Sequence, residues 1–196
     1  MTVHIDPRSG GYAEMHYDAI ENARLIVFRG TRLGSAKDIL TNLQPFLHIT
    51  PERYRWADEL AGRVAAENPG VRLVVTGHSL GGGLAIYAAM KHGLEDVVFN
   101  PAGFSANVVQ SLSLSPADWQ AGSRKITVFI TRSEAMIDPV SALSLAKETT
   151  LAGRRYLVEE KSGLSLAQLH GMKYLYRHLL DTLGPITGCA TDLGFQ

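Results

Sequence analysis

The sequence predicts a three-layer α/β sandwich, in which a mainly parallel β-sheet carries helices on both faces. Short apolar and β-branched runs alternate along the chain with longer segments of helical periodicity. Several of these runs are too apolar for strands with one face in water, which favours strands that are buried on both sides. The intervening segments have the length and pattern of helices that cross over between parallel strands.

Residues 1–196 are expected to form a single domain, because no repeat, low-complexity tract or Pro/Ser-rich linker marks a boundary. The 19 basic and 19 acidic side chains balance, so no overall field attracts the chain to nucleic acid, and we expect no such partner. The sequence shows no Sec signal and no run of eighteen apolar residues. We therefore expect a protein that is cytoplasmic or exported by a signal-independent route. The single Cys189 leaves the compartment open.

Strands are expected where β-branched and apolar residues gather between turn residues. The first two strands flank a turn at residues 21–22. The six predicted strands are residues 12–18, 23–29, 71–77, 96–100, 125–131 and 154–160.

Helices are expected between these strands. Thr50 as N-cap and Pro51 at the first position open a helix that stops at residues 68–70, and its apolar face predicts core packing alone. A second helix covers residues 84–90 or more. The last runs over residues 171–183 and ends at Gly-Pro.

The stretch GHSLG, residues 77–81, matches the G-x-S-x-G pattern of a nucleophile elbow. In such an elbow a strand turns so sharply into a helix that the serine is strained and its hydroxyl is exposed. Gly77 and Gly81 omit Cβ atoms that would block the turn around His78 and Ser79. The next two glycines, residues 82–83, would let the helix lie close to neighbouring strands. Ser79 is the predicted nucleophile, and the alternative is a tight turn without chemistry.

Two other glycine motifs fit worse. A dinucleotide fingerprint would need glycine or alanine where Ile86 stands, and the next strand ends in Asn100 rather than in an acid. A phosphate-binding P-loop would need Gly-Lys-Ser or Gly-Lys-Thr, which is missing here.

A serine nucleophile needs a histidine base and an orienting acid, which follow it in the order acid, histidine in this type of fold. His170 precedes the last predicted helix and is favoured over His178, which lies inside it. His92 is interpreted as a cation at a helix C-terminus. Asp138 follows the strand at 125–131 and is the favoured acid, with Glu134 as its competitor.

Together these motifs give the chain a family resemblance. VFRGT (27–31), DILTNL (38–43), GHSLGGGLA (77–85), Asp138-Pro139 and His170 resemble, in order and rough spacing, the class 3 lipase family of α/β-hydrolases. The resemblance implies an α/β-hydrolase fold and a lipase or phospholipase A that cleaves carboxylic esters of lipids without metal or cofactor. The roles it implies are nucleophile Ser79, acid Asp138, base His170, oxyanion hole Thr31 and Leu80, and Asp38 in support of the Thr31 loop.

Departures from the family pattern carry further expectations. Only residues 32–78 separate Thr31 from Ser79, so any lid must be short, and six apolar side chains there are interpreted as its rim or as core. These are Leu33, Ile39, Leu40, Leu43, Phe46 and Leu47.

The triple glycine and the stretch FNPAG, residues 99–103, resemble lipase domains of bacterial secreted effectors and polymorphic toxins, including type VI secretion phospholipases. This resemblance implies transient contact with a membrane surface, and an immunity protein or a secretion apparatus as partner. The alternatives are a short-chain esterase, thioesterase or acyltransferase with the same triad, or a non-catalytic lipid-binding module.

Overall fold

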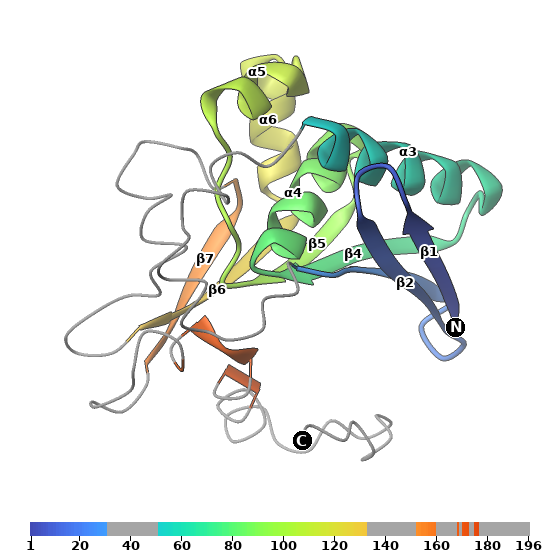
Figure 1. Cartoon of the computed structure of the whole chain (residues 1–196), viewed down its shortest axis with the longest axis horizontal. Coiled ribbons are helices and arrows are strands. Elements are labelled where there is room, and N and C mark those ends of the chain that lie inside the picture. Colours follow the sequence, from blue (N-terminus) through green and yellow to red (C-terminus); the bar gives the residue numbers. More distant parts are fainter. Residues whose placement is uncertain (31–50, 133–151, 160–167, 169, 173–174, 177–196) are drawn as a thin grey trace.

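The computed structural model describes residues 1–30, 51–132, 152–159, 168, 170–172 and 175–176. Its strands form one sheet in the order β1-β2-β3-β4-β5-β6-β7 (Figure 1). The pairs from β3 to β7 are parallel, and β1 and β2 add an antiparallel hairpin at one edge. The strands are β1 (Thr2–Asp6), β2 (Gly11–Asp18), β3 (Ala23–Phe28), β4 (Arg72–His78), β5 (Glu95–Phe99), β6 (Ile126–Arg132) and β7 (Arg154–Glu159).

All six predicted strands are confirmed, each to within one residue at either end. The sequence reading missed β1, which pairs only with β2 at the edge of the sheet. Its alternation of Val3 and Ile5 with polar residues is the signal that could have found it. Asp6 closes the strand, because its carboxylate accepts bonds from the backbone N–H groups of Arg8 and Ser9 and from the Ser9 hydroxyl.

The predicted helix at residues 51–67 is confirmed, and so is the helix at 84–90, which begins earlier than expected, at Leu80, so that the glycines lie inside it. The proposed cap Thr50 lies outside the described residues. Two short helices were not predicted, although Pro116 at the start of one and a bond from the Asp118 N–H to the Ser115 hydroxyl are ordinary start signals. The described helices are α3 (Pro51–Glu67), α4 (Leu80–His92), α5 (Ala106–Leu112) and α6 (Pro116–Ser123).

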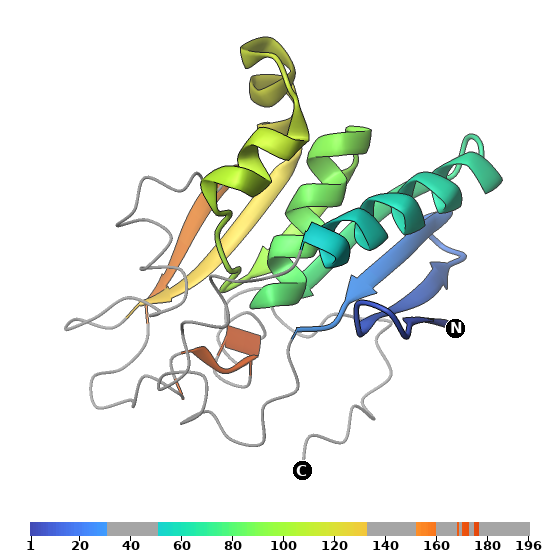
Figure 2. The ribbon, with the colours of Figure 1, turned by 45° about the horizontal axis from the view of Figure 1, so that its top comes forward.

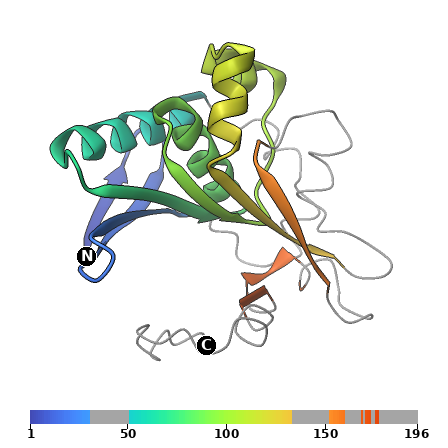
Figure 3. The ribbon, with the colours of Figure 1, turned by 180° about the vertical axis from the view of Figure 1, so that it is seen from behind.

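These four helices share one face of the sheet, because α4 contacts α3, α5 and α6 (Figure 2). Seen from the other side, β4 to β7 lie in front of them (Figure 3). The mainly parallel α/β fold is thus confirmed. The helix predicted at residues 171–183 lies mostly outside the described residues, so helices on both faces of the sheet stay a prediction.

The core lies between the sheet and α4. Every residue from Leu80 to Met90 is buried, as expected for a helix that is apolar all round. Alternate side chains of the central strands meet it, because successive residues of a strand point to opposite faces. Those exposed by 1% or less include Ile26, Phe28, Val75, Val98, Ile126, Val128 and Ile130. Since β3 to β6 run parallel, their carboxyl ends meet at one edge of this core.

Candidate active site

The turn from β4 into α4 carries the predicted nucleophile. Ser79 lies between the last residue of β4 and the first residue of α4, with φ of 57° and ψ of −124°. A serine at positive φ is strained, typically by about 1–3 kcal/mol, and persists only where surrounding bonds fix it. Its N–H donates to the carbonyl of Phe99 (3.2 Å), and its own carbonyl accepts from the N–H of Gly83 (3.2 Å).

The glycines of the elbow leave room for backbone contacts that any side chain would block. A Cβ on Gly77 would overlap the carbonyl of Gly81, and a Cβ on Gly81 would overlap the carbonyl oxygen of Phe28 at the end of β3. A Cβ on Gly82 would lie only 2.8 Å from the Cβ of Pro101. The glycines therefore let α4 begin in direct contact with the ends of both neighbouring strands.

The chain leaving β3 also passes beside the serine. A Cβ on Gly30 would lie 3.6 Å from the Cβ of Ser79 and 2.9 Å from the carbonyl oxygen of His78. Arg29 holds this stretch, since its N–H donates to the Tyr12 carbonyl (3.0 Å) and its guanidinium lies 3.7 Å from the centre of the Tyr12 ring. The segment that leads to Thr31 is thus anchored directly beside the elbow.

His170 lies at the same edge of the sheet. Its ring packs at 4.6 Å, centroid to centroid, from the ring of His78, the neighbour of Ser79. The Nε2 of His78 lies 2.7 Å from the carbonyl oxygen of His170, and because a carbonyl only accepts, this nitrogen carries the proton. Gly171 follows with a bond from its N–H to the Gln168 carbonyl (3.1 Å).

The nucleophile and the histidine are both enclosed. Ser79 is 5% exposed and His170 is 2% exposed. Gly30 and the segment after β5 pack against the elbow from two sides. Electrostatic interactions in such a water-poor environment are stronger than at the surface.

Of the residues predicted for the site, Ser79, Leu80, His78, His170 and the two elbow glycines gather at this edge of the sheet. The remaining candidates lie outside the described residues, and their roles stay predictions. These are Asp138, Thr31 and Asp38, the competitors Glu134 and His178, and the six apolar residues assigned to a rim.

Sequence reasoning missed Asn100 and Thr131, which are both fully buried. Asn100 has φ of 42° and directly follows β5. Its Nδ2 donates to the carbonyl of His170 (3.1 Å), and its Oδ1 accepts from the N–H (2.8 Å) and the hydroxyl (3.2 Å) of Thr131. An asparagine directly after a buried strand is the available signal, because asparagine tolerates left-handed backbone and bonds in both directions.

Comparison with known proteins identifies the family. The model of the phospholipase-like family described as "Tle-like phospholipase domain" matches residues 5–153. The chain belongs to this family. The match runs from the end of β1 through β6, and so includes the elbow and the segment after β5.

A relative of this Tle-like phospholipase domain is the extracellular phospholipase A1 of Serratia liquefaciens. It is 37% identical over 93 residues, which span 47% of this chain and 28% of the relative. The matched segment is thus less than a third of the Serratia protein's length.

Solved structures share the fold at low identity. MDLA of Penicillium cyclopium, in a mutant form, has a TM-score of 0.57 and 17% identity over 86% of this chain and 67% of its own. The Rhizomucor miehei lipase in its native propeptide complex has a TM-score of 0.54 and 20% identity over 91% and 67%. A triacylglycerol lipase structure reported to have a serine protease triad has a TM-score of 0.56 and 19% identity, over 80% of this chain and 65% of the lipase. The Tle-like domain therefore has the α/β-hydrolase fold of lipases.

Other polar features of the Tle-like domain lie away from the elbow. His92 ends α4, where the sequence placed it, and its Nε2 lies 2.6 Å from a carboxylate oxygen of Asp58. Asp96 lies near the amino end of β5, and burial raises the pKa of its carboxyl well above the usual range. Among the described residues, no helix is long and apolar enough to cross a bilayer.

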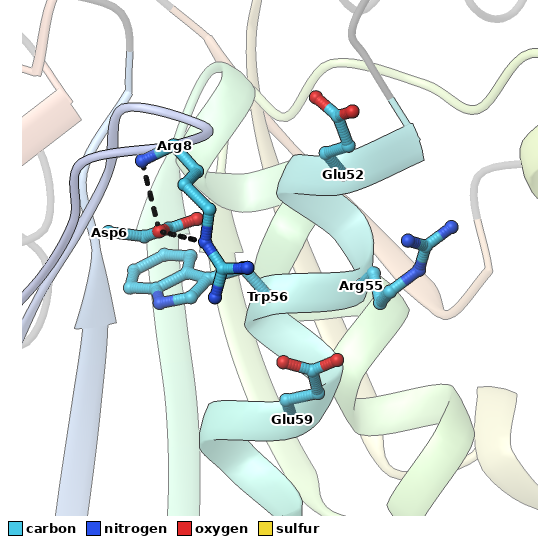
Figure 4. A pocket seen from close by; sticks show the side chains of 6 residues that line it. All are labelled: Asp6, Arg8, Glu52, Arg55, Trp56 and Glu59. Atoms are coloured by element: carbon cyan, nitrogen blue, oxygen red, sulfur yellow. Dashed lines mark hydrogen bonds and ion pairs between the residues drawn. The ribbon is translucent and has the colours of Figure 1, made fainter.

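A charged hollow of about 280 Å³ lies between the β1–β2 turn and the first turns of α3 (Figure 4). Its carboxylate Asp6 is already engaged by Ser9, whose hydroxyl bond is the main cause that lowers the Asp6 pKa. Trp56 packs edge-on against Phe28 and fills the space beside Gly11. The hollow includes none of the residues around Ser79. It is lined by Asp6, Arg8, Glu52, Arg55, Trp56 and Glu59.

Proposed function

We propose that this Tle-like domain is a serine hydrolase of the phospholipase A type, which cleaves carboxylic esters of phospholipids through an acyl-enzyme. The observation that carries the proposal is the strained Ser79 at a strand-to-helix elbow with the ring of His170 packed beside that elbow. A strained backbone at a buried polar residue is typical of functional sites, and a serine with a neighbouring histidine is the minimal pair for nucleophilic catalysis.

The reaction has two balanced steps. The Oγ of Ser79 attacks the ester carbonyl carbon while His170 takes its proton, and collapse of the tetrahedral intermediate expels the alcohol, which receives that proton. Water then attacks the acyl-enzyme with His170 as base, and the fatty acid leaves as Ser79 regains its proton. Asp138 is proposed as the acid that orients His170 and stabilises its charged form.

The start of α4 supports stabilisation of the oxyanion. Leu80 is the first residue of this helix, so its N–H is one of the four that no carbonyl within the helix accepts. The positive end of the helix dipole adds to the same effect. We propose Leu80 and Thr31 as the two donors, each worth about 2.7–4 kcal/mol of transition-state stabilisation by comparison with other such sites.

The family and the name of the Serratia relative support a phospholipid substrate over a triglyceride or a small soluble ester. The structural similarity to the fungal lipases supports the fold alone. Because the identity is 20% or lower, their substrates are not carried over to this chain. Contact with a membrane surface, and an immunity or secretion-apparatus protein as partner, stay predictions from the sequence resemblance.

The test compares substrates directly. The protein is incubated with phosphatidylcholine vesicles, a triglyceride emulsion and a short-chain p-nitrophenyl ester, and products are identified by mass spectrometry. We expect lysophospholipid and free fatty acid, and labelling of Ser79 by a fluorophosphonate probe. The Ser79→Ala variant should lose roughly 10⁴-fold or more of the activity while it stays folded.

Ser105→Ala is the matched control, since Ser105 also precedes a helix but has an ordinary extended backbone with φ of −70°. It should keep full activity and labelling. Turnover in Ser79→Ala equal to that of the wild type would contradict the proposal. Hydrolysis of the short ester alone would favour an esterase, and vesicle binding without labelling or turnover would favour a non-catalytic module.

A further inference from the structure

We propose that Asn100 is a positioning residue, which fixes the backbone of His170 relative to the nucleophile through the carbonyl of His170. The proposal rests on the function proposed above, in which His170 is the base. In this proposal Asn100 does not contact the substrate. It acts by fixing the position of the His170 imidazole.

The four residues Phe99–Ala102 form a bridge between the two catalytic groups. On one side the bridge holds Ser79 by two main-chain bonds: the Ser79 N–H donates to the Phe99 carbonyl (3.2 Å), and the Ala102 N–H donates to the Ser79 carbonyl (2.9 Å). On the other side the bridge holds His170, through the side chain of Asn100 (3.1 Å). Asn100 therefore lies within a segment that is bonded to both backbones.

The amide of Asn100 can lie in only one orientation. The N–H of Thr131 can only donate, so the atom that faces it at 2.8 Å must be Oδ1. The carbonyl of His170 can only accept, so the atom that faces it must be Nδ2. An amide satisfies both partners at once, whereas an ionised carboxylate of the same shape would turn an acceptor toward the carbonyl.

The backbone of Asn100 is itself fixed. Its N–H donates to the Phe129 carbonyl (2.8 Å), its φ of 42° is one that asparagine tolerates well, and the residue is fully buried. A second donor reaches the same His170 carbonyl from the elbow, the Nε2 of His78 at 2.7 Å. Two donors, one from β5 and one from β4, thus fix the position of this carbonyl.

The fixed carbonyl belongs to the residue that carries the imidazole, so a shift of one moves the other. A misplacement of about 1 Å in a catalytic group can cost on the order of 100-fold in rate. Loss of the Asn100 bond should therefore lower turnover more than substrate affinity, because the serine and the substrate-binding surface remain in place.

The experiment uses two variants of the full chain. Asn100→Ala removes the amide, and Asn100→Gly removes it and also tolerates the positive φ. With a soluble short-chain ester we expect kcat to fall roughly 10- to 100-fold with KM within about two-fold of the wild type.

Thr76→Val is the matched control. The Thr76 hydroxyl makes one side-chain bond to the Val97 carbonyl (2.5 Å) between β4 and β5, away from His170. Its loss should leave kcat and KM within about two-fold of the wild type. Folding of every variant is checked by circular dichroism, so that a loss of folded protein is not counted as a loss of kcat.

A second readout does not depend on activity. Amide hydrogen exchange at residues 168–172 should become faster in both Asn100 variants and stay unchanged in Thr76→Val, because the bond to the His170 carbonyl holds this stretch. Wild-type exchange and wild-type kcat in both Asn100 variants would overturn the positioning role and leave the hydrolase proposal standing. If the wild type hydrolyses no ester, the proposed function fails, and exchange alone decides whether Asn100 holds His170.

Discussion

The two ends of β5 bury polar side chains in opposite ways. At the carboxyl end, Asn100 is fully buried and both its amide oxygen and its amide nitrogen are hydrogen-bonded. At the amino end, Asp96 is 1% exposed, and neither carboxyl oxygen has a hydrogen-bond partner among the described residues. A hydrogen-bonded polar network thus lies just after β5, at the edge of the sheet that carries the site. A buried acid lies near the other end of the same strand.

The difference shows two ways to keep a polar group in a core. The Asn100 amide replaces the bonds that it would make with water, so that its burial costs little. At the Asp96 carboxyl burial outweighs the effect of the nearby Val97 N–H and favours the uncharged form, which raises the pKa of this carboxyl. Removal of the Asn100 amide should break the hydrogen-bond network. Removal of the Asp96 carboxyl should abolish a pH-dependent loss of stability.

The largest expected effect is that of Asn100→Leu. Leucine removes three hydrogen bonds of the amide, those from the Thr131 N–H and hydroxyl and that to the His170 carbonyl, each worth about 0.5–1.5 kcal/mol, or about 1.5–4.5 kcal/mol together. Urea denaturation measures the loss at unchanged m-value. A loss below about 1 kcal/mol would mean that the network contributes little to stability.

The second effect is on pH dependence, through Asp96→Asn. The unfolded chain releases the Asp96 proton near pH 4, whereas the folded chain keeps it to higher pH, so wild-type stability falls as pH rises between the two pKa values. The slope reaches at most about 1.4 kcal/mol per pH unit. Asp96→Asn should remove this slope, as measured by urea denaturation from pH 4 upward.

Glu95→Gln is the control, because Glu95 is the neighbour of Asp96 and its pKa moves the other way. The hydrogen bond from Arg72 lowers it, so Glu95 contributes stability above its unfolded pKa that is lost as pH falls through the lower, folded value. Equal pH profiles for Asp96→Asn and the wild type would contradict an uncharged Asp96.

Thr131→Val should have a smaller effect than Asn100→Leu. It removes the hydroxyl that lies 3.2 Å from the Asn100 oxygen and keeps the shorter bond from the Thr131 N–H. We expect a loss of about 0.5–1.5 kcal/mol in urea denaturation. A loss as large as that of Asn100→Leu would show that the hydroxyl, and not the backbone, holds the amide in place.

The smallest effect is expected at the exposed pair beside Asp96. Arg72 and Glu95 make two bonds of 3.0 Å and 2.6 Å, yet both side chains are about half exposed. A double-mutant cycle with Arg72→Ala and Glu95→Ala should give a coupling of about 0.2–1 kcal/mol that shrinks in high salt. A coupling above about 2 kcal/mol would show that exposure is a poor guide to the strength of this pair.

Much of the fold could be predicted because its signals are local. The β-branched runs of β3 to β7 and the start and stop residues of α3 each depend on neighbours a few positions away. The hairpin strand β1 was missed because its alternation is short, with only two apolar residues among five, and its pairing with β2 completes it. Helices α5 and α6 are short enough that periodicity says little about them.

In the site, as in the fold, the residues with a local sequence signal could be predicted and those with long-range partners could not. The G-x-S-x-G pattern identified the strained serine because the turn needs small residues at fixed positions around Ser79. Asn100 carried no such pattern, since its role depends on Thr131 and His170, which are 31 and 70 positions away along the chain. No local regularity reveals a contact of that separation.

By itself, the sequence determined where strands and helices form and which serine stands at the sharp turn, because propensity, capping and glycine sterics act between neighbours in the chain. Only the tertiary structure decided that the backbone of His170 is held by His78 at the end of β4 and by Asn100 just after β5. It also decided that, among the described residues, the buried Asn100 amide has hydrogen-bond partners and the buried Asp96 carboxyl has none. Hydrogen bonds and burial join residues that are close in space, and the folded sheet sets which residues those are.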